Sequence, residues 1–208
     1  MTLRRLFFEY IRRPLRDWRQ ERRLRQAVEM GAPLKVVLGG TAPAPEWFGS
    51  DIGFFDATCA TAWAELFGHE ASIDRLLAEH VFEHIPPELI PAVLENALRY
   101  LKTGGTIRIA VPDGHNPNPD YIRHVEPGGV GPGADDHKQL FTIEILSAAL
   151  EAAGFQVEPG EWFDSGGQFH ETPWSDDRGN IYRCKRHGTP DKSFSSSHLS
   201  LLVDGVKP

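Results

Sequence analysis

The stretch SIDRLLAEHVFEHIPP at residues 72–87 is the most informative part of this chain for its fold. Residues 72–79 are typical of a buried strand, and residues 80–84 spell H-x-x-E-H, a zinc-protease signature when it lies on a helix. A zinc site would need His80 and His84 on one helical face and a third ligand further along the chain. The two prolines that follow disfavour a helix past His84, so we expect a turn at the end of a strand instead.

The surrounding sequence alternates short apolar stretches with amphipathic ones. Strands are expected over residues 34–40, 47–52, 53–57, 72–79, 106–113, 155–163 and 196–204, and helices over 3–30, 61–67, 86–105 and 141–155. Such alternation predicts an α/β protein with a mostly parallel sheet. The last two strands have no helix between them, so an antiparallel pair is expected at one edge. Residues 114–138, rich in glycine and proline, are expected to form a loop or lid.

Length and composition indicate a soluble globular protein of one domain. The chain has 208 residues, of which 40% are hydrophobic and 25% charged, and its mean hydropathy is -0.35. Its two cysteines are too few for a disulfide framework, and neither belongs to a C-x-x-C pair. No apolar run approaches the roughly 20 residues that span a bilayer, and no signal peptide is recognisable. We therefore expect a cytoplasmic protein.

Positive charge is concentrated at the N-terminus. Residues 1–25 contain nine arginines and three acidic residues, although the whole chain carries a net charge of -7. We expect residues 1–33 to form a basic amphipathic helical arm and residues 34–208 to form the domain. The arm could pack on the domain or on a partner, or contact an anionic membrane surface peripherally at the inner face. Binding to nucleic acid is not expected, because the rest of the chain is acidic.

Polar residues and glycines follow successive predicted strands. In an open parallel sheet, ligands bind beyond the carboxyl ends of the strands. The residues that this rule brings together are Gly39, Gly40, Asp51, Asp56, Glu79, His80, Asp113 and His115. The sequence therefore predicts one binding site at this edge of the sheet.

Several stretches in this order resemble the class I S-adenosylmethionine (SAM)-dependent methyltransferases, and most closely the small methyltransferase type 11-like predicted enzymes. They are KVVLGG, WFGSDI, SIDRLLAEHVFEHI, ALRYLKTGGTIRIAVPDG and LSAALEAAGFQVE, which cover about residues 34–163. The terminal strand fits residues 196–204. The resemblance implies a Rossmann-like, open, mostly parallel seven-stranded sheet with an antiparallel edge strand and helices on both faces. It also implies SAM as the cofactor.

The resemblance further implies roles for the residues at the strand ends. Gly39 and Gly40 match the turn that lies against the methionine part of the cofactor, and Asp51 matches the acid that accepts hydrogen bonds from both ribose hydroxyls. A vicinal diol is well recognised by one carboxylate. Asp56 lies near the acid that meets the adenine amino group. Glu79 and His80 match the methionine side; His80 then faces the cleft, while Glu83 and His84 brace the loop.

One departure from the family pattern concerns the first glycine turn. Only ten residues separate Gly40 from Asp51, too few for a crossover helix and a strand. The helix N-terminus that would face the cofactor carboxylate is therefore expected to be missing or replaced by loop amides. This leaves open a catalytically silent, cofactor-binding scaffold or regulator. A nicotinamide dehydrogenase of similar fold is disfavoured, since no G-x-G-x-x-G opens a helix after the first strand.

The segment 114–138 contains the candidate catalytic residues. Methyl transfer is an in-line displacement that requires an aligned acceptor, and a hydroxyl acceptor benefits from a nearby base. We predict His137, His115 and Asp136 in this role, although Asp135 or Asp136 could also cap the next helix. No metal is expected, because no second carboxylate pair accompanies Asp135-Asp136-His137. The predicted reaction is O- or N-methylation of a small-molecule or glycan acceptor.

Overall fold

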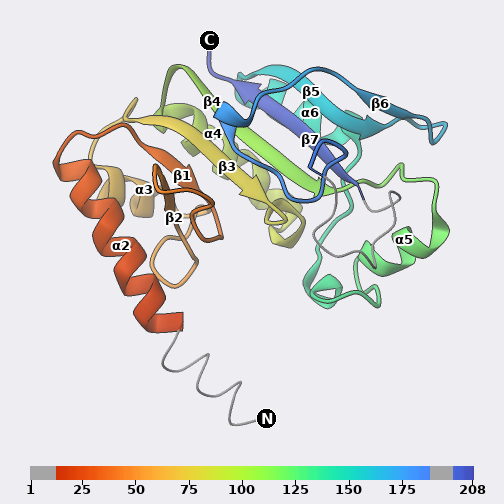
Figure 1. The fold of residues 1–208 in the computed structure, drawn as a ribbon, viewed down its shortest axis with the longest axis horizontal. Helices are drawn as coiled ribbons and strands as arrows, with labels where there is room; N and C mark the ends of the chain where they lie inside the picture. Colours follow the sequence, from red (N-terminus) through yellow and green to blue (C-terminus); the bar gives the residue numbers. More distant parts are fainter. Residues whose placement is uncertain (1–12, 188–198) are drawn as a thin grey trace, which may run out of the picture.

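The computed structural model describes residues 13–187 and 199–208, and within them a seven-stranded sheet forms the centre of the molecule (Figure 1). The strands lie in the spatial order β2-β1-β3-β4-β7-β5-β6. Their bounds are β1 Lys35–Val37, β2 Trp47–Gly49, β3 Ile73–Glu79, β4 Leu101–Pro112, β5 Gln156–Phe163, β6 Phe169–Glu171 and β7 Ser200–Val206.

The strand directions confirm the predicted α/β fold. β1 pairs in parallel with β2 and β3, and β3 pairs in parallel with β4. β7 is antiparallel to both β4 and β5, so β5 runs in the same direction as the parallel strands. The expected antiparallel pair is therefore present, but β7 lies inside the sheet. The edge is formed by β6, a short strand antiparallel to β5 that the sequence pattern did not indicate.

The described residues contain five α-helices, and local signals mark both ends of α6. Their bounds are α2 Arg13–Glu29, α3 Ala60–Phe67, α4 Ile90–Tyr100, α5 Pro119–Val125 and α6 Ile143–Ala153. The side chain of Thr142 accepts a hydrogen bond from the backbone of Ile145 and caps the start of α6. Gly154 ends that helix with a φ of 100°, a conformation that glycine adopts without strain.

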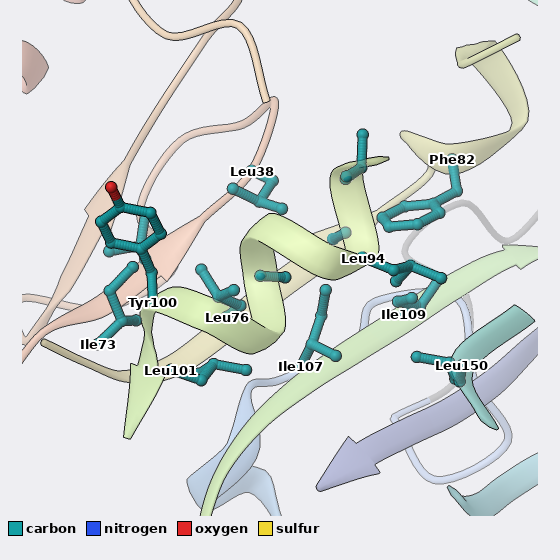
Figure 2. Close-up of a cluster of buried hydrophobic side chains, with 14 of the residues drawn as sticks. Leu38, Ile73, Leu76, Phe82, Leu94, Tyr100, Leu101, Ile107, Ile109 and Leu150 are labelled. Atoms are coloured by element: carbon teal, nitrogen blue, oxygen red, sulfur yellow. The ribbon is translucent and has the colours of Figure 1, made fainter. Parts of the chain in front are cut away.

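The helices α3, α4 and α6 pack against one another on one face of the sheet. Figure 2 shows the core beneath α4, where Leu94 and Tyr100 lie over side chains of β3 and β4 such as Leu76 and Ile107. On the opposite face, helical cover within the described residues is limited to a 3-10 helix, Asp176–Arg178, in the segment 174–187. Ile181 and Cys184 of this segment, hereafter the cover segment, pack on side chains of β1, β3, β4 and β7.

A buried ion pair attaches the cover segment to the sheet. The guanidinium of Arg108 on β4 donates from Nε and Nη2 to the two carboxylate oxygens of Asp204 on β7, at 2.7 and 2.8 Å. Its Nη1 donates to the backbone carbonyls of Ser175 and Gly179, and its Cζ lies 4.6 Å from the centre of the Trp174 ring. Arg108 is fully buried, so these partners, and not water, stabilise its positive charge.

Several predicted elements differ from the structure, three of them in more than the position of an end. Residues 53–57 are turns, not a strand, because the backbone carbonyl of Asp51 accepts the amides of Phe54 and Phe55. The helix expected over 86–105 ends at Tyr100, since Leu101 already pairs with Ile73 as part of β4. The loop expected over 114–138 contains α5.

The start of α5 explains why this segment is not a simple loop. The side chain of Asn118 accepts hydrogen bonds from the backbones of Asp120 and Tyr121, and Pro119 supplies the first helical residue. Residues 38–46, which connect β1 to β2, contain turns but no helix, as the short spacing before Asp51 predicts.

The N-terminal arm is described only from residue 13 onwards, so residues 1–12 of the predicted membrane-contacting stretch, residues 1–25, lie outside the described residues. α2 contacts β2 and α3, and its Leu24 is fully buried in the main core. The arm boundary at residue 33 stays a prediction. Among the described residues, no helix has both the length and the apolar character required to cross a membrane.

The ion pair between Arg108 and Asp204 makes a testable prediction. Arg108→Leu leaves Asp204 buried with a weaker partner, so we expect a loss of about 3–5 kcal/mol in the free energy of unfolding. Arg178 also contacts Asp204, at 3.1 Å, but its side chain is 29% exposed. Arg178→Leu is therefore the matched control, with an expected loss of about 0–1 kcal/mol. Urea unfolding measures both variants. Equal losses of unfolding free energy would contradict the idea that the buried pair matters more than the exposed one.

Candidate functional site

One turn separates two cavities at the carboxyl ends of the parallel strands. Residues 80–85 follow β3, and His80 adopts a φ of 55° that reverses the chain before the 3-10 helix Phe82–His84. Three side chains of the turn, Val81, Phe82 and Ile85, line one cavity. His80, Glu83 and His84 line the other. The H-x-x-E-H pattern is thus a turn, as expected, and both faces of that turn are part of a site.

The first cavity is mostly apolar, with a volume of about 100 Å³. Gly39 lies at its edge with a φ of 67°, and a Cβ atom there would come within 2.9 Å of Val81 Cγ2. Only glycine fits this position, because both the backbone conformation and the close approach exclude a side chain. The lining residues are Leu38, Gly39, Ser50, Ile52, Phe55, Asp56, Ala57, Thr58, Val81, Phe82, Ile85 and Val93.

The two acids expected on the cofactor side already have protein partners. Asp56 lines the apolar cavity, and its Oδ1 accepts hydrogen bonds from the backbone and the hydroxyl of Thr58, at 2.9 and 2.7 Å. Asp51 follows β2, and its Oδ2 accepts a hydrogen bond from Arg16 Nη2 of α2 at 2.7 Å. The Asp51 side chain is 15% exposed. The helical arm therefore places a cation on the carboxylate that was expected to bind ribose.

The remaining residues predicted on the cofactor side differ in their placement. Gly40 forms a backbone bridge with Ser50 next to the apolar cavity. Glu79 lines neither cavity; its Oε1 accepts hydrogen bonds from the backbones of Tyr182 and Arg183, at 2.8 and 3.2 Å. Glu79 thus fastens the cover segment to the end of β3.

The second cavity is polar and has a volume of about 290 Å³. It is enclosed by the turn after β3, the end of β4, α5, residues 131–137 and the cover segment. Its lining residues are His80, Glu83, His84, Pro112, Tyr121, His124, Val125, Gly131, Pro132, Ala134, His137 and Arg183. Four histidines, a carboxylate and a guanidinium therefore face one small space.

Hydrogen bonds orient the histidines of this polar cavity. His80 Nδ1 lies 2.9 Å from Glu83 Oε1, and its Nε2 lies 3.1 Å from the Ser200 hydroxyl. His137 Nδ1 lies 2.6 Å from the carbonyl oxygen of Val125. The rings of His84 and His137 meet edge to face, with their centres 4.8 Å apart.

Asp136, one of the predicted catalytic residues, lies just outside the cavity. It is exposed, and its Oδ2 lies 3.3 Å from His84 Nδ1. A hydrogen bond from Lys138 to Oδ1 lowers the pKa of Asp136, which keeps the carboxylate charged. Asp136 therefore reaches the cavity through His84 and does not line it.

His115 points away from this group of histidines. It does not line the polar cavity, and its Nε2 lies 2.9 Å from Glu144 Oε2 of α6. The carboxyl of the preceding Asp113 accepts the backbone N–H groups of His115 and Phe163, while burial raises its pKa. The structure thus separates His115 from His137, although both belong to the segment that was expected to act together.

Tyr121, His124 and Arg183 line the polar cavity but were not among the predicted site residues. Tyr121 and His124 belong to the expected loop and reach the cavity only because α5 forms. Burial raises the pKa of the Tyr121 hydroxyl, so it stays protonated, and it accepts the backbone N–H of Asp113 at 3.2 Å. Arg183 belongs to the cover segment, which carries no sequence signal for a site.

Comparisons with known proteins identify the family. A family model described as a methyltransferase domain matches residues 43–159, more than half of the chain. A SAM-dependent methyltransferase from Archaeoglobus fulgidus has a similar structure, with 18% identity, a TM-score of 0.52, and coverage of 99% of this chain and 100% of that chain. A possible histamine N-methyltransferase from Thermotoga maritima has 16% identity, a TM-score of 0.49, and coverage of 97% and 98%. No curated protein matches the sequence.

The apolar cavity fits part of the cofactor of this family. Its apolar lining suits a planar base, and Gly39 at its edge has no Cβ atom, which lets its backbone lie close to Val81. Asp51 follows β2 and Asp56 lies in the turns that come after it, so both carboxylates belong to the chain segment beside this cavity. The chain belongs to the class I SAM-dependent methyltransferases, and SAM is its cofactor.

Proposed function

We propose that the protein methylates a hydroxyl or amino group of a small molecule or glycan that binds in the polar cavity. The observation that carries this proposal is the shared wall between the two cavities. The turn 80–85 contributes three side chains to each cavity, so a donor on the apolar side and an acceptor on the polar side would lie next to each other. Such adjacency is what an in-line transfer between two bound reactants requires.

The size and lining of the polar cavity support a small polar acceptor. Its volume of about 290 Å³ is near the lower end of small-ligand sites. Histidines can accept a proton or hydrogen-bond an acceptor, and the Arg183 guanidinium suits an anionic or hydroxyl-rich group. A small molecule or the terminal sugar of a glycan fits these dimensions.

Among the predicted catalytic residues, His137 has the best position. It lines the cavity, and because the Val125 carbonyl holds Nδ1, its Nε2 remains available on the acceptor side. We assign Asp136 a positioning role, since it contacts His84 and not the cavity. His115 stays a prediction, and its bond to Glu144 favours a smaller contribution.

On the cofactor side, we propose that Asp51 binds the ribose hydroxyls, with Arg16 holding one of its oxygens. Asp56 would meet the adenine amino group, and Gly39, Gly40 and His80 would surround the methionine part. Glu79 would act through the cover segment that it fastens. Because both cysteines are free, Cys59 at the surface and Cys184 in the interior, we further propose that the enzyme works in the cytoplasm.

The first test of the proposed function concerns cofactor binding. Asp51→Asn removes the charged acceptor of two ribose hydrogen bonds, so we expect S-adenosylhomocysteine to bind at least about tenfold more weakly by titration calorimetry. Arg16→Gln is the matched control, because it removes the other half of the ion pair but leaves the carboxylate. We expect the Arg16→Gln variant to bind S-adenosylhomocysteine with unchanged or higher affinity. Equal losses in the two variants would mean that the ion pair is structural and that ribose binds elsewhere.

The second test of the proposed function concerns turnover. Once an acceptor is found, His137→Gln should lower kcat by about 100-fold and leave the affinity for S-adenosylhomocysteine unchanged, because His137 lies on the acceptor side. His69→Gln, at an exposed position between α3 and β3, should leave kcat unchanged. His115→Gln tests the separate prediction for that residue in the same assay. A normal kcat for His137→Gln would exclude the polar cavity as the acceptor site.

A cofactor-binding but silent scaffold is the second candidate. The ion pair on Asp51 and the connection without a helix after β1 favour it, since both weaken the usual cofactor contacts. Calorimetry with SAM and S-adenosylhomocysteine, with NAD as the control, tests both candidates together. A methyltransferase and a silent scaffold would each bind SAM, whereas a protein of unrelated function would not. Binding of SAM without turnover across a broad panel of acceptors would favour the scaffold.

A further inference from the structure

Three side chains at one end of the polar cavity have the composition of a metal site. Glu83, His84 and His137 each offer one ligand atom, and these atoms lie within 4.8 Å of one another. Glu83 and His84 come from the turn after β3, whereas His137 lies more than fifty residues further along the chain. All three line the cavity.

A buried oxygen atom points independently to a missing ligand. Glu83 is 1% exposed, and its Oε2 has no hydrogen-bond partner among the described residues. A buried carboxylate oxygen without a partner is costly, and in native proteins it calls for an explanation such as a bound ion. The ring nitrogens of His84 and His137 are the ligand atoms grouped with the Glu83 carboxylate.

The outer contacts of the three side chains are those of metal ligands. His80 Nδ1 bonds Glu83 Oε1, Asp136 Oδ2 contacts His84 Nδ1, and the Val125 carbonyl bonds His137 Nδ1. Metal-binding histidines usually donate their second ring N–H to a carboxylate or a backbone carbonyl. In each residue one polar atom is therefore held by the protein, and the other, Oε2 or Nε2, remains for an ion.

We propose that Glu83, His84 and His137 bind a divalent transition-metal ion, with Zn²⁺ as the best match. Two imidazoles and one carboxylate suit Zn²⁺, whereas Mg²⁺ and Ca²⁺ prefer sites made of oxygen atoms. Three protein ligands leave a fourth position open toward the cavity, where an oxygen or nitrogen atom of the acceptor, or a water molecule, would bind. This role in acceptor binding rests on the proposed function, but the binding of the ion does not.

The proposed site differs from the zinc-protease motif of the sequence. In that motif His80 and His84 would be ligands on one helix, with Glu83 as a base. In the structure, the positive φ of His80 turns its ring toward Glu83 and Ser200, so that His80 orients a ligand instead. The downstream ligand that the motif requires is His137.

The test is a calorimetric titration of tag-free protein, stripped with EDTA and dialysed, with Zn²⁺ and then with Mg²⁺. We expect one Zn²⁺ per chain with a dissociation constant below about 10 μM and no comparable binding of Mg²⁺. His84→Gln and His137→Gln should each weaken Zn²⁺ binding more than about tenfold. The control His69→Gln removes an exposed histidine outside the cavity and should bind Zn²⁺ like the unmodified protein.

A third variant separates metal binding from a structural role. Glu83→Gln keeps an oxygen that can accept the His80 hydrogen bond and removes a buried charge whose second oxygen has no partner. We therefore expect the metal-free variant to unfold at the same urea concentration as the unmodified protein, or a higher one, while Zn²⁺ affinity falls more than about tenfold. X-ray absorption of the zinc-loaded protein should show nitrogen ligands at about 2.0–2.1 Å.

Two outcomes would overturn the inference. One is the absence of Zn²⁺ binding in protein that is folded and binds S-adenosylhomocysteine. The other is Zn²⁺ binding that all three site variants retain, which would assign the ion to surface histidines. Zn²⁺ binding at the site without any binding of S-adenosylhomocysteine would instead contradict the proposed function and leave the metal site in place.

Discussion

The turn at His80 is the constraint on which the rest of the site depends. A φ of 55° in a residue other than glycine costs about 1–3 kcal/mol, so it persists only where neighbouring contacts hold it. Here the backbone N–H of His80 donates to Ala110 on β4, and the two ring nitrogens contact Glu83 and Ser200. Three side chains of this turn line the apolar cavity together with Gly39, and the other three line the polar cavity together with residues of α5. A donor cavity and an acceptor cavity can then share one wall.

The polar cavity also depends on what covers the second face of the sheet. The cover segment, which contains only one short 3-10 helix, lies on the face where the family resemblance implied further helices, and some of its backbone carbonyls are bonded from outside the segment. Arg108 compensates by donating to the carbonyls of Ser175 and Gly179 while it pairs with Asp204. Glu79 fastens the far end of the segment through the backbone of Arg183. The side chain of Arg183 reaches the cavity because both attachments hold the segment in place.

The basic arm packs on the domain, which is one of the alternatives that its sequence left open. The sequence did not specify the partner of Arg16, which is Asp51, the acid proposed to bind ribose. The ion pair lowers the free-energy cost of burying the Asp51 carboxylate, whose side chain is only 15% exposed. It also links the position of α2 to the cofactor site. The arm is therefore connected to the proposed chemistry, whatever residues 1–12 contact.

The sequence by itself determined the α/β class, most strands and helices, the turn at 80–85 and the absence of a helix between β1 and β2, because these follow from local periodicity, prolines and spacing. It also placed Gly39 and Asp51 just after strands, whereas the strand expected to end at Asp56 is absent. Only the tertiary structure decided that residues 53–57 turn around the carbonyl of Asp51, that His115 pairs with Glu144, and that His137 joins Glu83 and His84. The physical reason is that these outcomes depend on contacts between residues far apart in the chain. Periodicity reports which face of an element is buried, but not which partner it meets.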